Sequence, residues 1–221
     1  MNNTQLTTQA LDPVIMNETF WQYFQEEGKL VTAFMSGSIL DVACGRCRIV
    51  QYLSPTCKQY SGLDINLDLD KIFEDNKKLA PWSYKPSLSY YYHKDAREIS
   101  SLFKEDEFDN SCCLWNSLPI IGNEPQTLAD IANVTKNNIL ITLVAKNEQS
   151  LAARIKYYEG TGMSFTVDKE NHIIYSDVWG ASKGYDSSIF ETWAKDANVK
   201  LIESGPIGIL GNYGRYTAVK Q

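Results

Sequence analysis

Short apolar segments that alternate with amphipathic segments fill the middle of this chain and restrict its fold more than any other feature. Five of the apolar segments are typical of strands, at residues 38–42, 59–65, 88–93, 108–115 and 138–144. Helical patterns lie between them, at about residues 46–53, 67–79 and 124–133. Alternation of strands and helices at such short intervals predicts a parallel sheet with helices on both faces.

The segments on either side of this alternation follow other patterns. Residues 13–35 carry apolar side chains at helical spacing, which predicts two short helices, the first capped by Asn17 or Thr19. After a helical pattern at 148–158, two apolar runs flank residues 168–171, as in an antiparallel hairpin. A helix at 187–197 and strands at 200–204 and 213–219 complete the pattern. No linker-like segment interrupts it, so we expect one domain over residues 1–221.

Composition and charge restrict the class of protein and its partners. A chain of 221 residues, 43% of them hydrophobic and 22% charged, suits a globular protein with a substantial core. The net charge of −6 and the lack of a long basic run disfavour nucleic acid as a partner. The N-terminus lacks a signal-peptide pattern and no long apolar run occurs, so we expect a cytoplasmic protein without a membrane span. An odd number of cysteines, 5, fits a reduced compartment.

The segment SILDVACGRCRIV at residues 38–50 supports two interpretations. Cys44 and Cys47 have the C-x-x-C spacing of a redox pair or of half a zinc site. As backbone, the same segment is a strand, a turn of small residues and a helix, which is the shape of a nucleotide-binding turn. A thioredoxin-type fold needs fewer strand–helix units, and a second pair of zinc ligands at suitable spacing is missing. We therefore expect no metal site and favour the nucleotide interpretation.

An acid at the end of the second strand is the further requirement of a nucleotide-binding turn. Asp64 meets it, because it stands 19 positions after Gly45 (64 − 45 = 19), close to the spacing of about 20 in such motifs. A carboxylate in this place can accept hydrogen bonds from both vicinal hydroxyls of a ribose. The pair of Gly45 and Asp64 therefore favours a ligand that contains a nucleoside.

Four segments in order, ILDVACGRCR, GLDI, KDARE and FDNSCCLWNSL, resemble the successive motifs of class I S-adenosylmethionine-dependent methyltransferases. The resemblance covers about residues 39–144 and continues through KGYDSSIFETWAKDANVKLIESGP, which is similar to the small-molecule branch of that family. It implies an α/β fold: a doubly wound, Rossmann-like sheet of seven strands, mostly parallel, with an antiparallel last strand and helices on both faces. It also implies S-adenosylmethionine as the cofactor.

The resemblance assigns roles to the first turn. Asp41 would lie near the methionine amino group of the cofactor. Ala43, Gly45 and Cys47 would occupy the three glycine positions of the family pattern, of which only Gly45 is a glycine. The side chain of Cys47 stands where the backbone should approach the ligand, which puts cofactor affinity in question.

Later motifs supply the adenosine contacts that the resemblance implies. Asp64 would bind the ribose hydroxyls and Ile65 would pack against adenine. Asp95 would accept from the adenine amino group, and Ala96 would offer its backbone amide. Asp95 has an alternative role as a helix N-cap, because Glu98 follows three residues later as in a capping box.

The candidates for the reacting end of the cofactor follow strands three and four. By the resemblance, Trp115 and Asn116 would line the methionine and the methyl group, although Trp115 could be ordinary core and Asn116 could serve a turn. His93, at the end of strand three, is the best-placed imidazole, with a surface role as its alternative. His93 and Asn116 are therefore the candidate catalytic residues.

Methyl transfer from a sulfonium is an in-line displacement, in which alignment and desolvation are the main tasks of the protein. Aromatic residues in the N-terminal segment and after the hairpin predict a lid from residues 1–36 and from an insertion at about 159–185.

We expect a small-molecule acceptor. The alternatives are a regulatory protein that binds S-adenosylmethionine without turnover, a protein or RNA methyltransferase, and a dinucleotide-dependent oxidoreductase, the last disfavoured because G-x-G-x-x-G is missing.

Overall fold

The computed structural model of this protein describes residues 17–65 and 88–219. Seven strands form one sheet in the order β3-β2-β1-β4-β5-β10-β9. Their bounds are β1 Gly37–Val42, β2 Cys57–Asp64, β3 Leu88–His93, β4 Phe108–Cys113, β5 Thr135–Val144, β9 Val199–Ile207 and β10 Gly211–Ala218. The first five strands pair in parallel, and β10 runs antiparallel between β5 and β9. The predicted sheet with its antiparallel last strand is confirmed.

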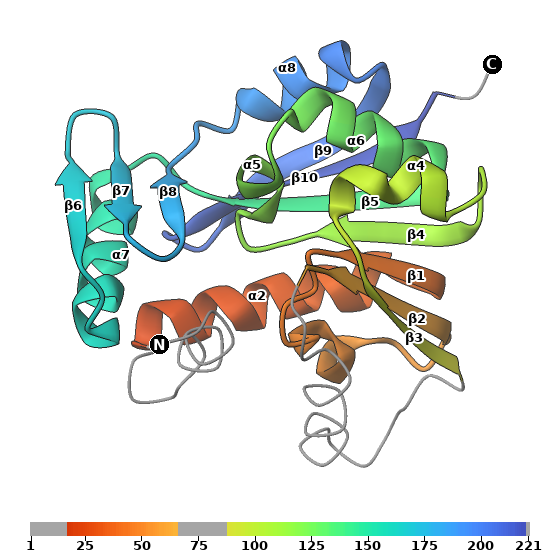
Figure 1. The fold of residues 1–221 in the computed structure, drawn as a ribbon, viewed down its shortest axis with the longest axis horizontal. Helices are drawn as coiled ribbons and strands as arrows, with labels where there is room; N and C mark the ends of the chain where they lie inside the picture. The colour runs from red at the N-terminus through yellow and green to blue at the C-terminus, as the bar shows by residue number, and fades with distance from the viewer. Residues whose placement is uncertain (1–16, 66–87, 220–221) are drawn as a thin grey trace.

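Helices cover both faces of this sheet (Figure 1). One face carries α2 (Glu18–Phe34) and the 3₁₀ helix η1 (Arg48–Tyr52). The other carries α4 (Ile99–Leu102), α5 (Ser117–Ile121), α6 (Glu124–Asn133) and α8 (Ile189–Asp196), with the 3₁₀ turn η2 (Ala96–Glu98) before α4. Successive strand side chains point to opposite faces, so in β1 Ile39 packs in the core under α2 and Leu40 in the opposite core. This double burial explains the continuous apolar run in β1.

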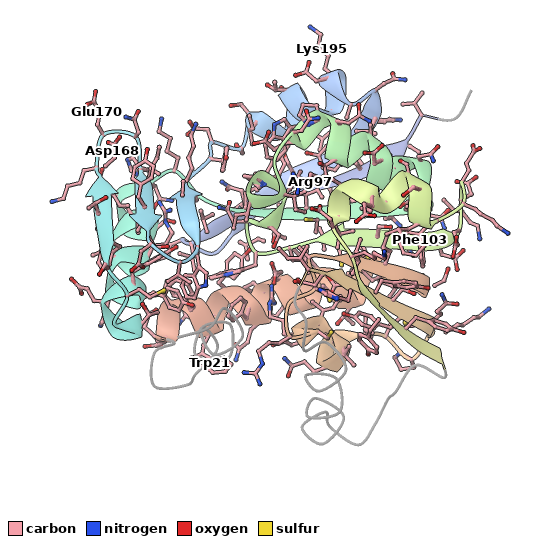
Figure 2. All side chains as sticks on the ribbon, in the orientation of Figure 1. Trp21, Arg97, Phe103, Asp168, Glu170 and Lys195 are labelled. Atoms are coloured by element: carbon pink, nitrogen blue, oxygen red, sulfur yellow. The ribbon has the colours of Figure 1, made fainter. Side chains whose placement is uncertain are left out.

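The insertion after β5 contains α7 (Glu148–Thr161) and a separate three-stranded sheet of β6 (Phe165–Asp168), β7 (Ile173–Ser176) and β8 (Gly180–Lys183). It leaves and rejoins the main sheet at one place, because Ala145 and Tyr185 form a bridge. In Figure 1 the small sheet and α7 lie together at one end of the molecule. The predicted hairpin is confirmed as β6 and β7, with Asp168 and Glu170 at its outer end (Figure 2). The third strand was not predicted.

The N-terminal region corrects one expectation, because α2 is a single helix and not two. Asn17 caps it, with its side chain accepting from the Phe20 amide at 3.2 Å, as one of the two predicted caps. The helix continues through Gly28, where a Cβ atom would lie 2.5 Å from the Tyr52 ring. Gly28 therefore permits close packing of η1 and does not end the helix. Trp21 is on the outer side of α2 and points away from the sheet (Figure 2), with 42% of its surface exposed.

Smaller differences concern element ends. The helix expected at 46–53 is the shorter η1, and strand four ends at Cys113 and not at residue 115. The helix predicted at 67–79 lies outside the described residues. In the described part of the chain, no helix combines the length and apolar character needed to cross a membrane.

Candidate functional site

The first turn, residues 43–47, has a backbone that suits glycine at alternate positions. Ala43, Gly45 and Cys47 have φ values of 55°, 52° and 54°. A non-glycine residue in this left-handed region costs about 1–2 kcal/mol. The Cys44 amide donates to the Leu63 carbonyl of β2 at 3.1 Å, and the Cys47 amide donates to the Cys44 carbonyl at 2.8 Å. These bonds fix the turn at the carboxyl ends of β1 and β2.

The two cysteines of the turn pack into the core under α2. Cys44 is 7% exposed and Cys47 is 1% exposed, and their sulfur atoms lie 3.7 Å apart as free thiols. Burial raises the pKa of the Cys44 thiol well above its ordinary value, which keeps it protonated and poorly nucleophilic. Within residues 17–65 and 88–219, no three His, Cys, Asp or Glu side chains gather as a metal site would require. This geometry favours the nucleotide-turn interpretation over the redox one.

Gly45 leaves the opposite side of the turn open. A Cβ atom built on Gly45 would meet no atom within 4 Å. Its amide donates to Asp64 Oδ2 at 2.8 Å, so the predicted glycine and ribose positions are adjacent. Ile65, the next residue, is 69% exposed. The structure thus brings Gly45, Asp64 and Ile65 together beside open space that a nucleoside can fill.

Asp41 lies inside the protein, at the end of β1. It is 3% exposed, and its carboxyl group accepts from the Tyr60 hydroxyl at 2.7 Å and from the Cys112 thiol at 3.5 Å. Burial raises the pKa of Asp41 to about 7, although the hydrogen bond from Tyr60 and the charge of Arg48 lower it. The group therefore changes its charge near neutral pH.

The residues after β3 lie at the same edge of the sheet. His93 pairs with Asp64 in the register of β3 with β2, is exposed, and has its Nε2 atom 3.0 Å from the Ile65 carbonyl oxygen. Asp95 caps η2, accepting from the Arg97 amide at 2.9 Å and from Arg97 Nε at 3.0 Å. These hydrogen bonds lower the pKa of Asp95. Ala96 is buried beneath it, and the proposed N-cap role of Asp95 is confirmed.

Trp115 and Asn116 both adopt left-handed backbone conformations after β4, with φ of 58° and 60°. The Trp115 amide donates to Thr142 Oγ1 at 2.7 Å, and its ring lies 4.7 Å from that of Phe24. Asn116 accepts from the Val144 amide at 3.2 Å and donates to the Lys183 carbonyl at 3.3 Å. Asn116 thus links the end of β4 to β5 and to the insertion.

A buried charge pair at this edge was not predicted. Glu27 of α2 is fully buried and forms an ion pair with Nη2 of Arg48, whose guanidinium lies 4.3 Å from the Phe24 ring centre. Glu27 Oε1 also accepts from the Tyr23 hydroxyl at 3.0 Å and from Thr142 Oγ1 at 2.5 Å. The signal was in the sequence, because Glu27 interrupts the apolar stripe of α2 at a position that faces the sheet.

Together these residues fit an adenosyl ligand with an amino-acid end. Gly45 leaves space, Asp64 supplies an acceptor beside it, and Nη1 of Arg48 is buried without a hydrogen-bond partner in the described part of the chain. Arg48 follows this turn in the chain and its charge acts on Asp41, and a cationic donor without a partner is complementary to a carboxylate.

Comparison with known proteins gives one family and many structures. The family described as a methyltransferase domain matches residues 40–142. No curated protein matches the chain. A SAM-dependent methyltransferase from Aquifex aeolicus superposes with a TM-score of 0.63 at 12% identity, over 99% of this chain and 100% of that one.

Two further structures share the fold at low identity. A chain of the complex between the Haloferax volcanii Trm112 methyltransferase activator and a methyltransferase gives a TM-score of 0.62 at 11% identity, covering 95% of this chain and 96% of that one. The 1,6-didemethyltoxoflavin-N1-methyltransferase of Burkholderia thailandensis, with bound 1,6-didemethyltoxoflavin and S-adenosylhomocysteine, gives 0.59 at 12% identity, with 90% and 79% covered. The match shows a methyltransferase domain over residues 40–142, and these structures show that the chain has the fold of S-adenosylmethionine-dependent methyltransferases.

Proposed function

We propose that this protein is an S-adenosylmethionine-dependent methyltransferase that acts on a small molecule. The observation that carries the proposal is a set of aromatic contacts between α2, the end of β4 and the insertion. Phe20 of α2 lies 5.2 Å from the Trp115 ring and stacks on Tyr157 of α7 at 4.7 Å, and Trp179 stacks on Tyr157 at 6.0 Å. Aromatic walls exclude water and hold flat or cationic groups. We infer that α2 and the insertion, the expected lid segments, enclose a compact acceptor.

The first turn and β2 would hold the cofactor, which supplies an electrophilic methyl group on a positively charged sulfur. Ala43 and Gly45 would offer backbone beside the open space, and Asp41 would face the methionine amino group. Asp64 would accept from the ribose hydroxyls while it keeps its bond to the Gly45 amide. Because the leaving thioether is neutral, the protein needs no acid to assist its departure.

The adenine would lie beyond β2 and β3. Ile65, already exposed, would pack against the ring, and Asp95 and Ala96 would meet its polar edge. The bonds from Arg97 hold the Asp95 carboxylate in place at the start of η2. An acceptor that is already held in place can bind a base without the entropy cost of ordering its side chain on binding.

Trp115, Asn116 and His93 would serve the reacting end. The bonds of Asn116 to Val144 and Lys183 support a role in aligning the acceptor wall. His93 is the candidate base for an acceptor that must lose a proton, and its exposed imidazole is held by the Ile65 carbonyl. Alignment of acceptor and methyl group is the larger contribution to rate in this reaction class.

Charge also favours a small acceptor over nucleic acid. The chain carries a net charge of −6, which opposes the phosphate contacts that RNA or DNA binding requires. The Burkholderia thailandensis relative in fold was solved with 1,6-didemethyltoxoflavin, a small molecule. The free cysteines of the chain support the expected cytoplasmic location, which we retain as part of the proposal.

Calorimetry and a methyl-transfer assay test the proposal. We expect S-adenosylmethionine and S-adenosylhomocysteine to bind and NAD not to bind. Release of S-adenosylhomocysteine should then depend on one class of compound in a panel of small molecules, peptides and RNA. Turnover with RNA or protein alone would overturn the acceptor class, and binding without turnover across the whole panel would favour a regulatory protein.

A further inference from the structure

We propose that Arg48 binds the carboxylate at the amino-acid end of S-adenosylmethionine, and that Glu27 positions the Arg48 guanidinium for this contact. The inference rests on the cofactor and on the site described above, and it adds two residues that the family resemblance did not supply. It follows from a count of hydrogen-bond donors and acceptors around one buried ion pair.

Arg48 has more donors than partners. Its Nη2 atom pairs with Glu27 Oε2, and the flat face of the guanidinium lies on the Phe24 ring. Nη1 is buried and has no hydrogen-bond partner among residues 17–65 and 88–219. A buried donor without an acceptor loses its hydration without compensation, so native proteins rarely retain one without a reason. A ligand anion supplies that reason.

Two other half-buried or buried arginines in the structure use their donors differently. Arg154 donates from Nη1 to the Ser182 carbonyl at 2.8 Å and from Nη2 to the His172 carbonyl at 2.9 Å, which fastens α7 to the small sheet. Arg215 stacks on Phe34 at 4.7 Å, as Arg48 stacks on Phe24, but its Nη1 donates to Asn138 and its Nε to Glu203. Both terminal nitrogens of Arg154 are used for protein contacts. Arg48 alone of these three keeps a terminal nitrogen buried and unused.

Glu27 fixes the position of the Arg48 guanidinium because its own carboxylate is held in one orientation. Its Oε1 accepts from both Tyr23 and Thr142, so its orientation is fixed, and Oε2 is left to face Arg48. Thr142 also accepts from the Trp115 amide at 2.7 Å. One continuous set of contacts therefore connects Arg48 to the backbone at the end of β4, where the reacting groups are expected.

The position of Arg48 suits the amino-acid end of the cofactor. Arg48 begins η1 directly after the first turn, three residues from Gly45, and its charge acts on Asp41. Asp41 would meet the ammonium of the amino acid, so the carboxylate of the same group needs a cation nearby. Arg48 presents such a cation in a planar fork that matches a carboxylate.

Ligand analogues test the inference on the wild-type protein. S-adenosylhomocysteine and its decarboxylated analogue differ only in the carboxylate, and 5′-methylthioadenosine lacks the whole amino-acid end. We expect the decarboxylated analogue to bind about 10- to 100-fold more weakly than S-adenosylhomocysteine in calorimetry. Equal affinity would overturn the inference. Absence of binding by all three nucleosides would instead remove the cofactor assignment itself.

Substitutions assign the effect to Arg48. Arg48→Gln should lower affinity for S-adenosylhomocysteine about 10- to 100-fold and leave affinity for 5′-methylthioadenosine within about twofold. Glu27→Gln keeps the hydrogen-bonding shape but removes the charge, and should lower the ratio of the two affinities by a smaller factor. Arg215→Gln, which removes a similarly stacked and paired arginine, should leave the ratio unchanged. Equal loss of both ligands in Arg48→Gln would show a structural role only, and the wild-type comparison still decides if that variant does not fold.

Discussion

The carboxylate of Asp64 accepts a hydrogen bond from the backbone amide of Gly45 at 2.8 Å, and this contact joins the ends of β2 and β1. It involves Oδ2 of Asp64, beside the open space over Gly45. Asp64 therefore has a structural task and a proposed binding task at once. Substitutions that keep one task and remove the other can separate them.

Asp64→Ala removes both tasks, and we expect it to weaken S-adenosylhomocysteine binding by about 1–3 kcal/mol, the usual loss for a charged hydrogen-bond partner. Asp64→Asn keeps an oxygen that can accept from the Gly45 amide but replaces the other acceptor with a donor. It should retain most of the thermal stability and still lose affinity. Calorimetry and thermal unfolding of the three proteins check this, and unchanged affinity in Asp64→Ala would show that β2 does not bind the ribose.

Cys47→Gly should preserve or improve cofactor binding. The side chain of Cys47 packs in the core, so its removal does not open or close the binding side of the first turn. Glycine also adopts the φ of 54° without the cost of about 1–2 kcal/mol that a side chain incurs there. Affinity for S-adenosylhomocysteine, measured with the free energy of unfolding by urea, reports both effects. Loss of a redox activity in the variant would instead support the C-x-x-C interpretation.

Gly45→Ala should have the opposite effect on cofactor binding to Cys47→Gly. Its methyl group would meet no protein atom but would enter the space assigned to the cofactor. We expect a loss of stability of only about 1–2 kcal/mol from the left-handed backbone, together with a marked loss of S-adenosylhomocysteine affinity. Calorimetry beside urea unfolding distinguishes the two contributions, and full affinity in Gly45→Ala would place the ligand elsewhere.

The regular elements were predictable where local pattern and tertiary packing agree. β3 and α6 have the bounds that the sequence pattern indicated, because each combines periodic apolar residues with clear ends. β8 was missed because GASK has no apolar alternation and only the neighbouring strand β7 makes it a strand. The continuity of α2 was not predicted, and the reason for a glycine within it, the ring of Tyr52, lies 24 positions away in sequence (52 − 28 = 24).

The candidate site also contains one contact that the sequence predicted and one that it did not. Gly45 and Asp64 were found together because a spacing rule expresses the contact that the structure contains. The Glu27–Arg48 pair has no such rule, since it joins a helix and a 3₁₀ turn that meet only when both pack on the sheet. A glutamate in an apolar helical stripe signals a buried partner but does not say which residue it is.

Gly28→Ala should destabilise the protein, although alanine is the better helix former by about 1 kcal/mol. The added Cβ would lie 2.5 Å from one Tyr52 ring atom and 2.7 Å from two others, so the ring must move. Overpacking of this kind costs about 1–3 kcal/mol. Urea unfolding measures the change, and the same substitution in a Tyr52→Ala background should be neutral or stabilising. An equal loss in both backgrounds would contradict the proposed contact.

Asp41 should make stability depend on pH in the direction opposite to that of most carboxylates. Its pKa in the folded protein is about 7 against 3.8 in an ordinary environment, so between these values the folded state binds more protons than the unfolded state. Stability from this group is fully present below about pH 4 and decreases as pH rises to about 7, by up to about 1.4 kcal/mol per pH unit.

Asp41→Asn removes this titration, so the variant should gain stability relative to wild type as pH rises across that interval. Urea unfolding of both proteins at pH 5 and pH 8 measures the difference and cancels the contributions of other groups. Tyr60→Phe removes a hydrogen bond that lowers the pKa of Asp41, and should extend the loss of stability to higher pH. A wild type and an Asp41→Asn variant with parallel pH profiles would mean that Asp41 is ionised throughout, and that its charge is stabilised by Arg48 more strongly than burial opposes it.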